Sequence, residues 1–310
     1  MLAQARYLAN FADFVTHREQ RERDDRDALR ELEARPLSLP AGLEVEWLGV
    51  SGYRMTYEGQ TLFIDPYVSR VGLDDVVSKR MTLPDPSRVA RHLSRPSEEQ
   101  VVGVLVGHTH FDHAVDAPAV AARYSCPAYG SASLIQLMAL HGLAGQAVEV
   151  VPHRPYELGP FMVRFVPSAH SKLLLGLAVP AGGELTCEHL HGLHPGAYRC
   201  GQVWGIRIEV AGISFYHQGS ANLLDDEVPS GGVDVFLAGV AGRGFTDRYW
   251  ERILRRLQPR TVVPTHYDDF FRPLDAPMGL SLNVKVGRVP DEVARVSRDI
   301  EVAALALASS

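Results

Sequence analysis

The sequence predicts a mixed α/β (α+β) protein whose sheets are covered by helices, and three observations support this class. Several short stretches alternate apolar and polar residues with a period of two, which is typical of half-buried strands. One stretch, 100–107, is apolar without alternation and predicts a strand buried on both faces. Segments with helical periodicity lie between these strands, so both kinds of element are interleaved along the chain.

Composition narrows the function classes. The 310 residues are 46% hydrophobic, enough to bury a large core, so we expect a globular protein. The formal net charge is -6 and the basic residues are scattered, so we expect no nucleic-acid partner. No apolar signal sequence and no stretch of roughly 18 apolar residues is found, which predicts a cytoplasmic location and no transmembrane segment. Three widely spaced cysteines exclude a disulfide framework: Cys126, Cys187 and Cys200.

Residues 1–36 predict an N-terminal helical extension. Apolar positions with a 3.6-residue period are followed by a heavily charged segment that ends at Pro36. We interpret the charged segment as the solvent-exposed face of a helix that packs on the main body. A partner-binding arm is the alternative. This helix could pack within one chain or across two, so a homo-oligomer stays open. Residues 37–310 then form one large domain.

The other expected elements follow in chain order. Glu58 and Gly59 join two of the expected strands in a hairpin. Residues 70–100 contain three prolines among charged residues and predict loops with short helices. Strands are expected at 43–49, 52–59, 60–66, 100–107, 147–151, 161–166, 203–210, 213–217, 233–239 and 261–264, and helices near 114–124, 131–142 and 246–257.

The stretch GVLVGHTHFDHAVDAP, residues 103–118, gathers three histidines and an aspartate directly after the buried strand. In extended backbone, residues i and i+2 face the same way, so His108 and His110 present two imidazoles to one metal ion. A helix beginning near Ala114 places Asp112 and His113 at its N-terminus, where they can serve a second ion. Ordinary surface or core histidines are the alternative, which four such residues at this spacing make a poor explanation.

The motif HTHFDH resembles the H-x-H-x-D-H motif of the metallo-β-lactamase superfamily. The resemblance covers roughly 43–275, because FIDPY, VPSAHS, SFYHQGSANL and VVPTHYDDF are similar, in order and spacing, to the other motifs of that superfamily. The forms FIDP, VPSAHS and VPTHYDDF look most like the branch that includes ascorbate-6-phosphate lactonases and N-acylphosphatidylethanolamine phospholipase D. The resemblance implies a four-layer αββα sandwich that carries one or two metal ions at one edge of its paired sheets.

The resemblance also implies a ligand set. It assigns the first metal to His108, His110 and His170, and the second metal to Asp112, His113 and His266. His170 and His266 each follow a predicted strand, as the first cluster does. With nitrogen and oxygen donors and no cysteine, Zn²⁺ is the expected ion, and Mn²⁺ and Fe²⁺ stay open.

Ser220 departs from the family pattern. The family usually has an aspartate after Gly219 that bridges both ions, and a neutral hydroxyl is a far poorer ligand. Three outcomes stay open: a bridge of water or hydroxide alone, a single tightly bound metal, or substitution by a neighbour such as His217, Asn222, Asp225 or Asp226. For His217 we expect a direct metal role or a place in the pocket. Asp65 resembles the family aspartate that fixes loops and ligand histidines from behind, and a turn-forming aspartate before proline is the alternative.

Residues 171–202 predict an insertion that arches over the active site as a lid. Its leucines, together with His189, His191 and His194, would line a substrate pocket and favour an acyl or otherwise apolar substrate. A separate zinc site that includes Cys187 and Cys200 is the alternative, although the spacing matches no usual structural zinc motif.

The expected function is hydrolysis of a small ester, lactone or phosphodiester by a water that the metal activates. Asp112 would orient that water and pass its proton to the leaving group. A binding or regulatory protein that keeps the fold but has a degenerate metal site is the alternative, and Ser220 is the feature that divides the two. A nuclease of the same fold is disfavoured by the acidic balance.

Overall fold

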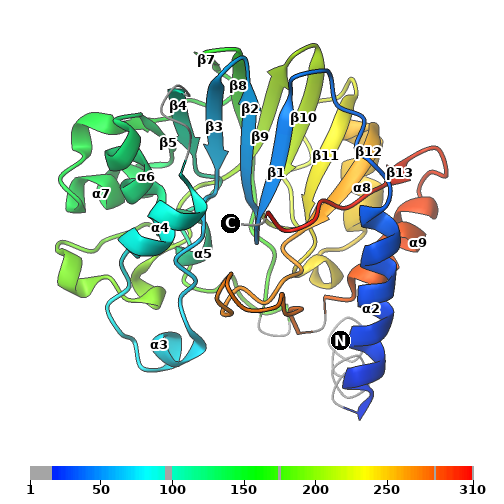
Figure 1. Ribbon diagram of the computed structural model, residues 1–310, viewed down its shortest axis with the longest axis horizontal. Helices are drawn as coiled ribbons and strands as arrows, with labels where there is room; N and C mark the ends of the chain where they lie inside the picture. Colours follow the sequence, from blue (N-terminus) through cyan, green and yellow to red (C-terminus); the bar gives the residue numbers. More distant parts are fainter. Residues whose placement is uncertain (1–15, 95–99, 174–175, 283, 309–310) are drawn as a thin grey trace.

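The structure, a computed structural model, describes residues 16–94, 100–173, 176–282 and 284–308. Two β-sheets face each other, and helices cover their outer faces, so the layers follow the order helix, sheet, sheet, helix (Figure 1). This arrangement confirms the α/β (α+β) class and the αββα sandwich. Among the described helices, none has the length and apolar character needed to cross a membrane.

The first sheet has the order β1-β2-β3-β4-β5-β6. β2 pairs antiparallel with both β1 and β3, whereas β3 to β6 run parallel. The strands are β1 (Glu44–Gly49), β2 (Gly52–Tyr57), β3 (Gln60–Ile64), β4 (Gln100–Leu105), β5 (Ala128–Gly130) and β6 (Ala147–Glu149).

The second sheet has the order β13-β12-β11-β10-β9-β8-β7. β10 to β13 run parallel, and β7, β8 and β9 meander antiparallel beside them. The strands are β7 (Pro155–Leu158), β8 (Phe161–Ser168), β9 (Val203–Val210), β10 (Ile213–Gln218), β11 (Val233–Gly239), β12 (Pro259–Thr265) and β13 (Glu301–Val302).

Helices α4, α6 and α7 gather beside the first sheet, and α8 and α9 beside the second (Figure 1). α3 and α5 lie in the loops at one end of the sandwich. The helices are α2 (Arg18–Glu33), α3 (Leu73–Val77), α4 (Pro86–His92), α5 (Phe111–Ala114), α6 (Ala117–Tyr124), α7 (Ala132–Leu140), α8 (Tyr249–Leu257) and α9 (Val289–Ala294).

The alternation of β3 explains how one sheet serves two cores. Leu62 and Ile64 point into the core between the sheets, whereas Phe63 joins the core under α4, α6 and α7. β4 behaves in the same way, with Leu105 in the inner core and Val104 in the outer one. The non-alternating apolar strand predicted at 100–107 is therefore buried on both faces, as a strand covered by a sheet and by helices must be.

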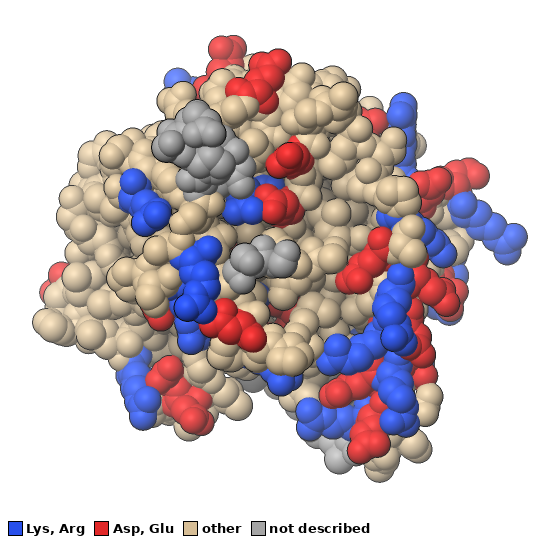
Figure 2. Space-filling model, in the orientation of Figure 1, with Lys and Arg blue, Asp and Glu red and all other residues tan. Residues whose placement is uncertain are grey.

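α2 forms the described part of the predicted N-terminal helix, and the part before residue 16 lies outside the described residues. Leu29 and Leu32 are buried, and the carboxylate of Asp25 accepts a hydrogen bond from the backbone N–H of Gly287 at 2.8 Å. The rest of the helix carries both signs of charge along its exposed length (Figure 2). The described part therefore packs on the body through the face that carries Leu29 and Leu32.

Several element boundaries differ from the predictions. The helix predicted near 114–124 is divided into α5 and α6, and Pro118 stands in the first turn of α6. The helix predicted at 246–257 begins only at Tyr249, because Arg248 has left-handed backbone. The short elements β5, β7, β13 and α9 were not predicted, since two to six residues carry too little periodicity to be recognised.

Candidate metal centre

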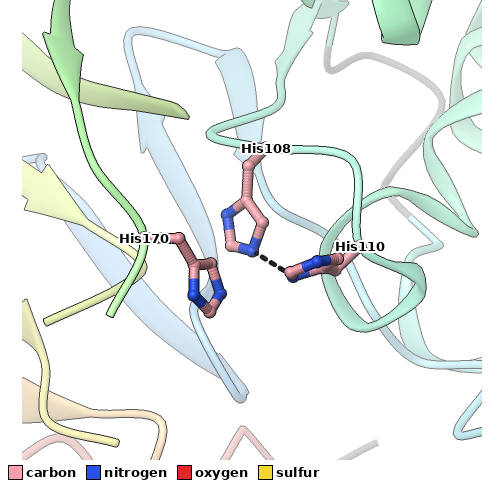
Figure 3. A group of neighbouring side chains, drawn as sticks. All are labelled: His108, His110 and His170. Carbon is pink, nitrogen blue, oxygen red and sulfur yellow. Dashed lines mark hydrogen bonds between the residues drawn. The ribbon is translucent and has the colours of Figure 1, made fainter. Parts of the chain in front are cut away.

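Six side chains that are distant in the sequence converge at one end of the sandwich. His108, His110 and His170 form one group, and Asp112, His113 and His266 form a second. Within each group, one ligand atom per residue lies within 4.8 Å of the others. Figure 3 shows the rings of the first group turned toward one another, with His170 coming from the segment after β8, opposite the loop that carries the other two.

Strand ends bring these residues together. The cluster 108–113 follows β4, His170 follows β8 and His266 follows β12. β8 and β12 point the same way, because β8 and β10 each pair antiparallel with β9 while β10, β11 and β12 are parallel. The two sheets are joined at this end by a hydrogen bond of 2.8 Å from the backbone N–H of Trp204 to the carbonyl of Gly107.

The ring nitrogens of the first group are arranged as donors to a cation. Nε2 of His108 lies 3.1 Å from Nδ1 of His110. Two nitrogens bound to one tetrahedral zinc at about 2.0–2.1 Å would be roughly 3.3 Å apart, which is close to this separation. The outer nitrogens face backbone carbonyls, with Nε2 of His110 2.8 Å from Pro180 O and Nδ1 of His170 2.7 Å from Ser171 O. Each of these outer nitrogens donates its proton, so the inner nitrogen keeps its lone pair.

The second group is built around Asp112. Its Oδ2 lies 3.3 Å from Nε2 of His266 and 3.7 Å from Nε2 of His113. Nδ1 of His113 donates to Oδ2 of Asp65 at 2.8 Å, which leaves Nε2 of His113 for a cation. Nδ1 of His266 is buried and has no hydrogen-bond partner among the described residues. One carboxylate and two imidazoles therefore face a common point.

Burial keeps the first group neutral. Desolvation, together with the neighbouring histidines, holds the pKa of His108 well below its usual value and lowers the pKa of His170 to about 3. The pKa of His110 is also lowered, mainly by burial. In the second group, burial opposes the shift, but Asp112 and Asp65 raise the pKa of His113. Neutral imidazoles are the form that binds metal, so the first group is ready to do so at neutral pH.

Asp112 is a carboxylate at neutral pH. Burial on its own would raise the pKa of Asp112, but the neighbouring His113 and His266 hold it well below the usual value. The ionised form is the one that ligates a cation or accepts a proton.

Asp65 lies directly behind His113 of the second group. It is fully buried, and its Oδ1 accepts a hydrogen bond from the backbone N–H of Gly107 at 2.6 Å, while Oδ2 receives the bond from His113. Its backbone, like that of His266, is left-handed, with φ of 42° and 62°. Such backbone costs about 1–3 kcal/mol at a residue other than glycine, and it often occurs at functional sites.

The donor set fits a divalent metal ion. Six nitrogen and oxygen donors, three of them on rings oriented by outer hydrogen bonds, suit Zn²⁺ and also Mn²⁺ or Fe²⁺. The backbone at position 219 passes close to His113 and Asp65, so this position requires glycine. A Cβ at Gly219 would lie 2.9 Å from Cε1 of His113 and 3.1 Å from Oδ2 of Asp65.

Ser220, the residue that replaces the expected aspartate, is engaged elsewhere. Its Oγ accepts a hydrogen bond of 2.9 Å from the backbone N–H of Ser171 and lies 3.2 Å from Oγ of Ser171. Asn222 does not substitute for a carboxylate, because its amide donates to the carbonyl of His170 and its oxygen accepts from Leu223 N. Two other candidates pair with arginines of α8: Asp225 with Arg252 and Asp226 with Arg256.

His217 lies one layer behind the second group. It is fully buried, its Nε2 donates to the carbonyl of Ser51 at 2.9 Å, and the same nitrogen lies 3.8 Å from Oδ2 of Asp65. Burial lowers the pKa of His217, which keeps the ring neutral. Its Nε2 is turned to Ser51 and Asp65, so this ring supports Asp65 and the loop around Ser51.

The insertion 171–202 reaches the cluster through its backbone. Besides the contact of Pro180 with His110, the hydroxyl of Thr109 donates to the carbonyl of Cys200 at 3.2 Å. The middle of the insertion lies toward the segment after β3, where Thr82 N donates to Leu193 O at 2.7 Å.

The histidines of the insertion stand apart from the six donors. His189 and His191 are exposed, His194 is half-buried, and the two exposed rings have centroids 6.5 Å apart. The metal-binding groups found among the described residues do not include these histidines, Cys187 or Cys200, whose thiols are free.

Sequence reasoning missed the contacts made by backbone atoms. Pro180 O and Ser51 O leave no signal, because any residue offers a carbonyl. Ser171 could have been noticed as the neighbour of His170, but its bond to Ser220 joins loops 49 residues apart.

Comparison with known proteins agrees with this geometry. The family profile described as "Beta-lactamase superfamily domain" matches residues 44–266. A metal-dependent hydrolase of Anaeromyxobacter sp. (strain K) is 29% identical over 248 residues, covering 76% of this chain and 79% of the relative. A metal-dependent hydrolase of Polaromonas sp. is 26% identical over 242 residues, covering 72% of this chain and 77% of the relative.

A solved structure shares the fold. CmlA, a diiron β-hydroxylase from Streptomyces venezuelae, superposes with a TM-score of 0.54 at 16% identity. The match covers 87% of this chain and 54% of CmlA.

Proposed function

This chain belongs to the β-lactamase superfamily, as a metal-dependent hydrolase, and we propose that it cleaves a small ester, lactone or phosphodiester with a metal-activated water. The convergence of six inward-facing donors in two groups is the observation that carries this proposal. We assign one metal ion to His108, His110 and His170. A second ion would lie with Asp112, His113 and His266.

A bound metal ion would activate the water and polarise the substrate, and the residues of the chain would hold the metal ligands in place. A bound divalent ion lowers the pKa of water to about 7 and polarises the oxygen of the bond under attack. Pro180 O and Ser171 O keep the rings of His110 and His170 in the tautomer whose inner nitrogen is free. Asp65 does the same for His113. Zn²⁺ is our first choice of ion, with Mn²⁺ and Fe²⁺ as the alternatives.

Asp112 is the proton-transfer group. Its carboxylate is ionised at neutral pH and only partly occupied by His266 and His113, so it can accept a proton from the attacking water. The same carboxyl group then returns the proton to the leaving oxygen. No nucleophilic side chain is needed for this reaction.

The test combines metal analysis with a substrate screen. We expect protein purified without chelator to contain one or two transition-metal ions per chain and to hydrolyse at least one of a p-nitrophenyl ester, a γ-lactone or bis(p-nitrophenyl) phosphate. Asp112→Asn should lower kcat by about 10²–10⁴-fold, whereas Asp225→Asn on the surface should not. Protein with no transition metal, or equal rates for Asp112→Asn and wild type, would contradict the proposal.

Ser220 favours one rival function, a binding or regulatory protein with a degenerate metal site. In that case metal would bind the three histidines of the first group, and no substrate of the screen would turn over. If Ser220→Asp then restored hydrolysis, the site would be identified as a former active site that has lost its catalytic activity.

A further inference from the structure

Together, the two ligand groups contain a single carboxylate, which belongs to Asp112. Of the six donors, five are imidazoles, which bring no charge when they offer a lone pair, and Asp112 brings one negative charge. Asp65 adds a second negative charge behind His113. Two divalent ions would bring four positive charges to a pocket whose ligands are largely buried, where unbalanced charge is costly. The protein therefore supplies less negative charge than two ions require.

No neighbouring residue in the described part of the chain fills this deficit. Ser220 is 4% exposed, and its hydroxyl is held by the N–H and Oγ of Ser171. The position before it is restricted to glycine, because a Cβ at Gly219 would press on His113 and Asp65. Asp225 and Asp226 are committed to the arginines of α8.

We propose that an oxyanion of the substrate, a phosphate or a carboxylate, supplies the missing charge, so that the second metal ion binds tightly only together with an anion. The inference rests on the proposed function and narrows its substrate class. Anionic substrates are preferred over neutral esters and lactones. Because binding linkage is reciprocal, the second metal strengthens anion binding by the same factor as the anion strengthens metal binding.

The first group has no such dependence. His108, His110 and His170 form a set of three neutral nitrogens, and backbone carbonyls fix the tautomers of His110 and His170. A single dication leaves a smaller excess of charge, which Asp112 and one hydroxide can balance. The two sites therefore differ in affinity when no anion is present, with the first one the tighter.

The experiment is a Zn²⁺ titration of the full-length, metal-stripped protein against a chromophoric chelator. It is run with acetate, with methylphosphonate, and with acetamide, which has nearly the shape of acetate but no charge. We expect two binding steps in wild type. The weaker step should tighten by about tenfold or more with either anion, and acetamide should leave it unchanged. Acetate and methylphosphonate distinguish a carboxylate from a phosphate preference.

Two substitutions separate charge from size. Ser220→Asp should bind the second Zn²⁺ tightly and lose the anion dependence. The asparagine of Ser220→Asn is similar in size to aspartate but neutral, so this variant should keep the wild-type dependence on anions. Circular dichroism checks that both variants fold. If Ser220→Asp does not fold, wild type and Ser220→Asn still test the anion effect.

Each contrary result has a separate meaning. Two tight Zn²⁺ ions in wild type with no anion effect would overturn the inference and leave the proposed function standing. A single Zn²⁺ that no anion supplements would overturn it in favour of a mononuclear hydrolase. Failure to bind any Zn²⁺ would instead contradict the proposed function on which the inference rests.

Discussion

Oδ2 of Asp65 lies 2.8 Å from Nδ1 of His113, and both side chains are buried. The two residues are 48 positions apart and follow neighbouring parallel strands, β3 and β4. This pair sets the tautomer of a proposed metal ligand and ties the loop after β3 to the loop after β4 through Gly107 N.

Asp65→Asn should weaken metal binding at the second group while the first group keeps its affinity. The two donors approach different oxygens of Asp65, so in an asparagine either Gly107 N–H or His113 Nδ1–H would face an amide NH2 in place of an acceptor. Loss of such a supporting carboxylate costs about 10–100-fold in metal affinity. Zn²⁺ titration measures both steps, and Asp225→Asn is the matched control on the surface. An unchanged second step would show that Asp65 is only a turn residue.

Asp268→Asn should destabilise the protein by about 3–5 kcal/mol, because it leaves the buried guanidinium of Arg70 without its partner. The two side chains are 1% and 2% exposed, and Arg70 Nη1 lies 2.8 Å from Asp268 Oδ2. The pair joins the segment after β3 to the loop that carries His266. Urea unfolding measures the change.

Asp75→Asn is the control for that measurement. Asp75 pairs with Arg80 at the surface, where the side chains are 37% and 69% exposed, and such pairs contribute less than about 1 kcal/mol. Equal losses for the two variants would contradict the importance of the buried pair.

The contribution of Asp116 to the stability of the protein should fall as the pH rises from about 4 to about 6. Burial raises the pKa of Asp116 to about 6, although Ser69 and Val68 N–H groups oppose the shift. The folded state thus holds its proton above pH 4, where the unfolded chain has lost it, so rising pH favours unfolding until the carboxyl ionises in both states. A shift of about two units corresponds to roughly 3 kcal/mol.

Asp116→Asn should remove this dependence. Urea unfolding of both proteins between pH 4 and 7, with chelator present to exclude metal, gives the difference directly. Asp225→Asn serves as a control, since hydrogen bonding to Arg252 lowers the pKa of Asp225 from 3.8 and its contribution is lost only below that value, so its difference from wild type should stay nearly constant over this range. A constant difference between wild type and Asp116→Asn across this range would mean that Asp116 is ionised throughout.

Leu177→Ser should reduce kcat/KM for a p-nitrophenyl octanoate ester by about 5–10-fold and leave the acetate ester nearly unchanged. Leu177 lies in the insertion and is 66% exposed, so it is free to contact an acyl chain. Leu282→Ser is the matched control, because Leu282 is similarly exposed at 62% but lies outside the insertion. Parallel losses with both esters would argue against an apolar lid.

The sequence by itself determined the class and most of the central strands, because alternation along β1 to β3 and the apolar run of β4 reflect faces that must be buried. It also located the cluster 108–113, whose spacing is local and whose chemistry is carried by residue type. Short elements such as β5 and β13 escaped, since their pairing partners rather than their own residues stabilise them.

Only the tertiary structure decided how the site is held. Pro180 O on His110 and Ser171 on Ser220 join loops that the chain separates by tens of residues, and they use backbone atoms that every residue possesses. The sequence could identify Ser220 as the departure from the family pattern. The hydroxyl of Ser220 is turned to Ser171 because the ends of two strands pack together there, and no local pattern encodes this packing. The metal centre is left short of negative charge as a result.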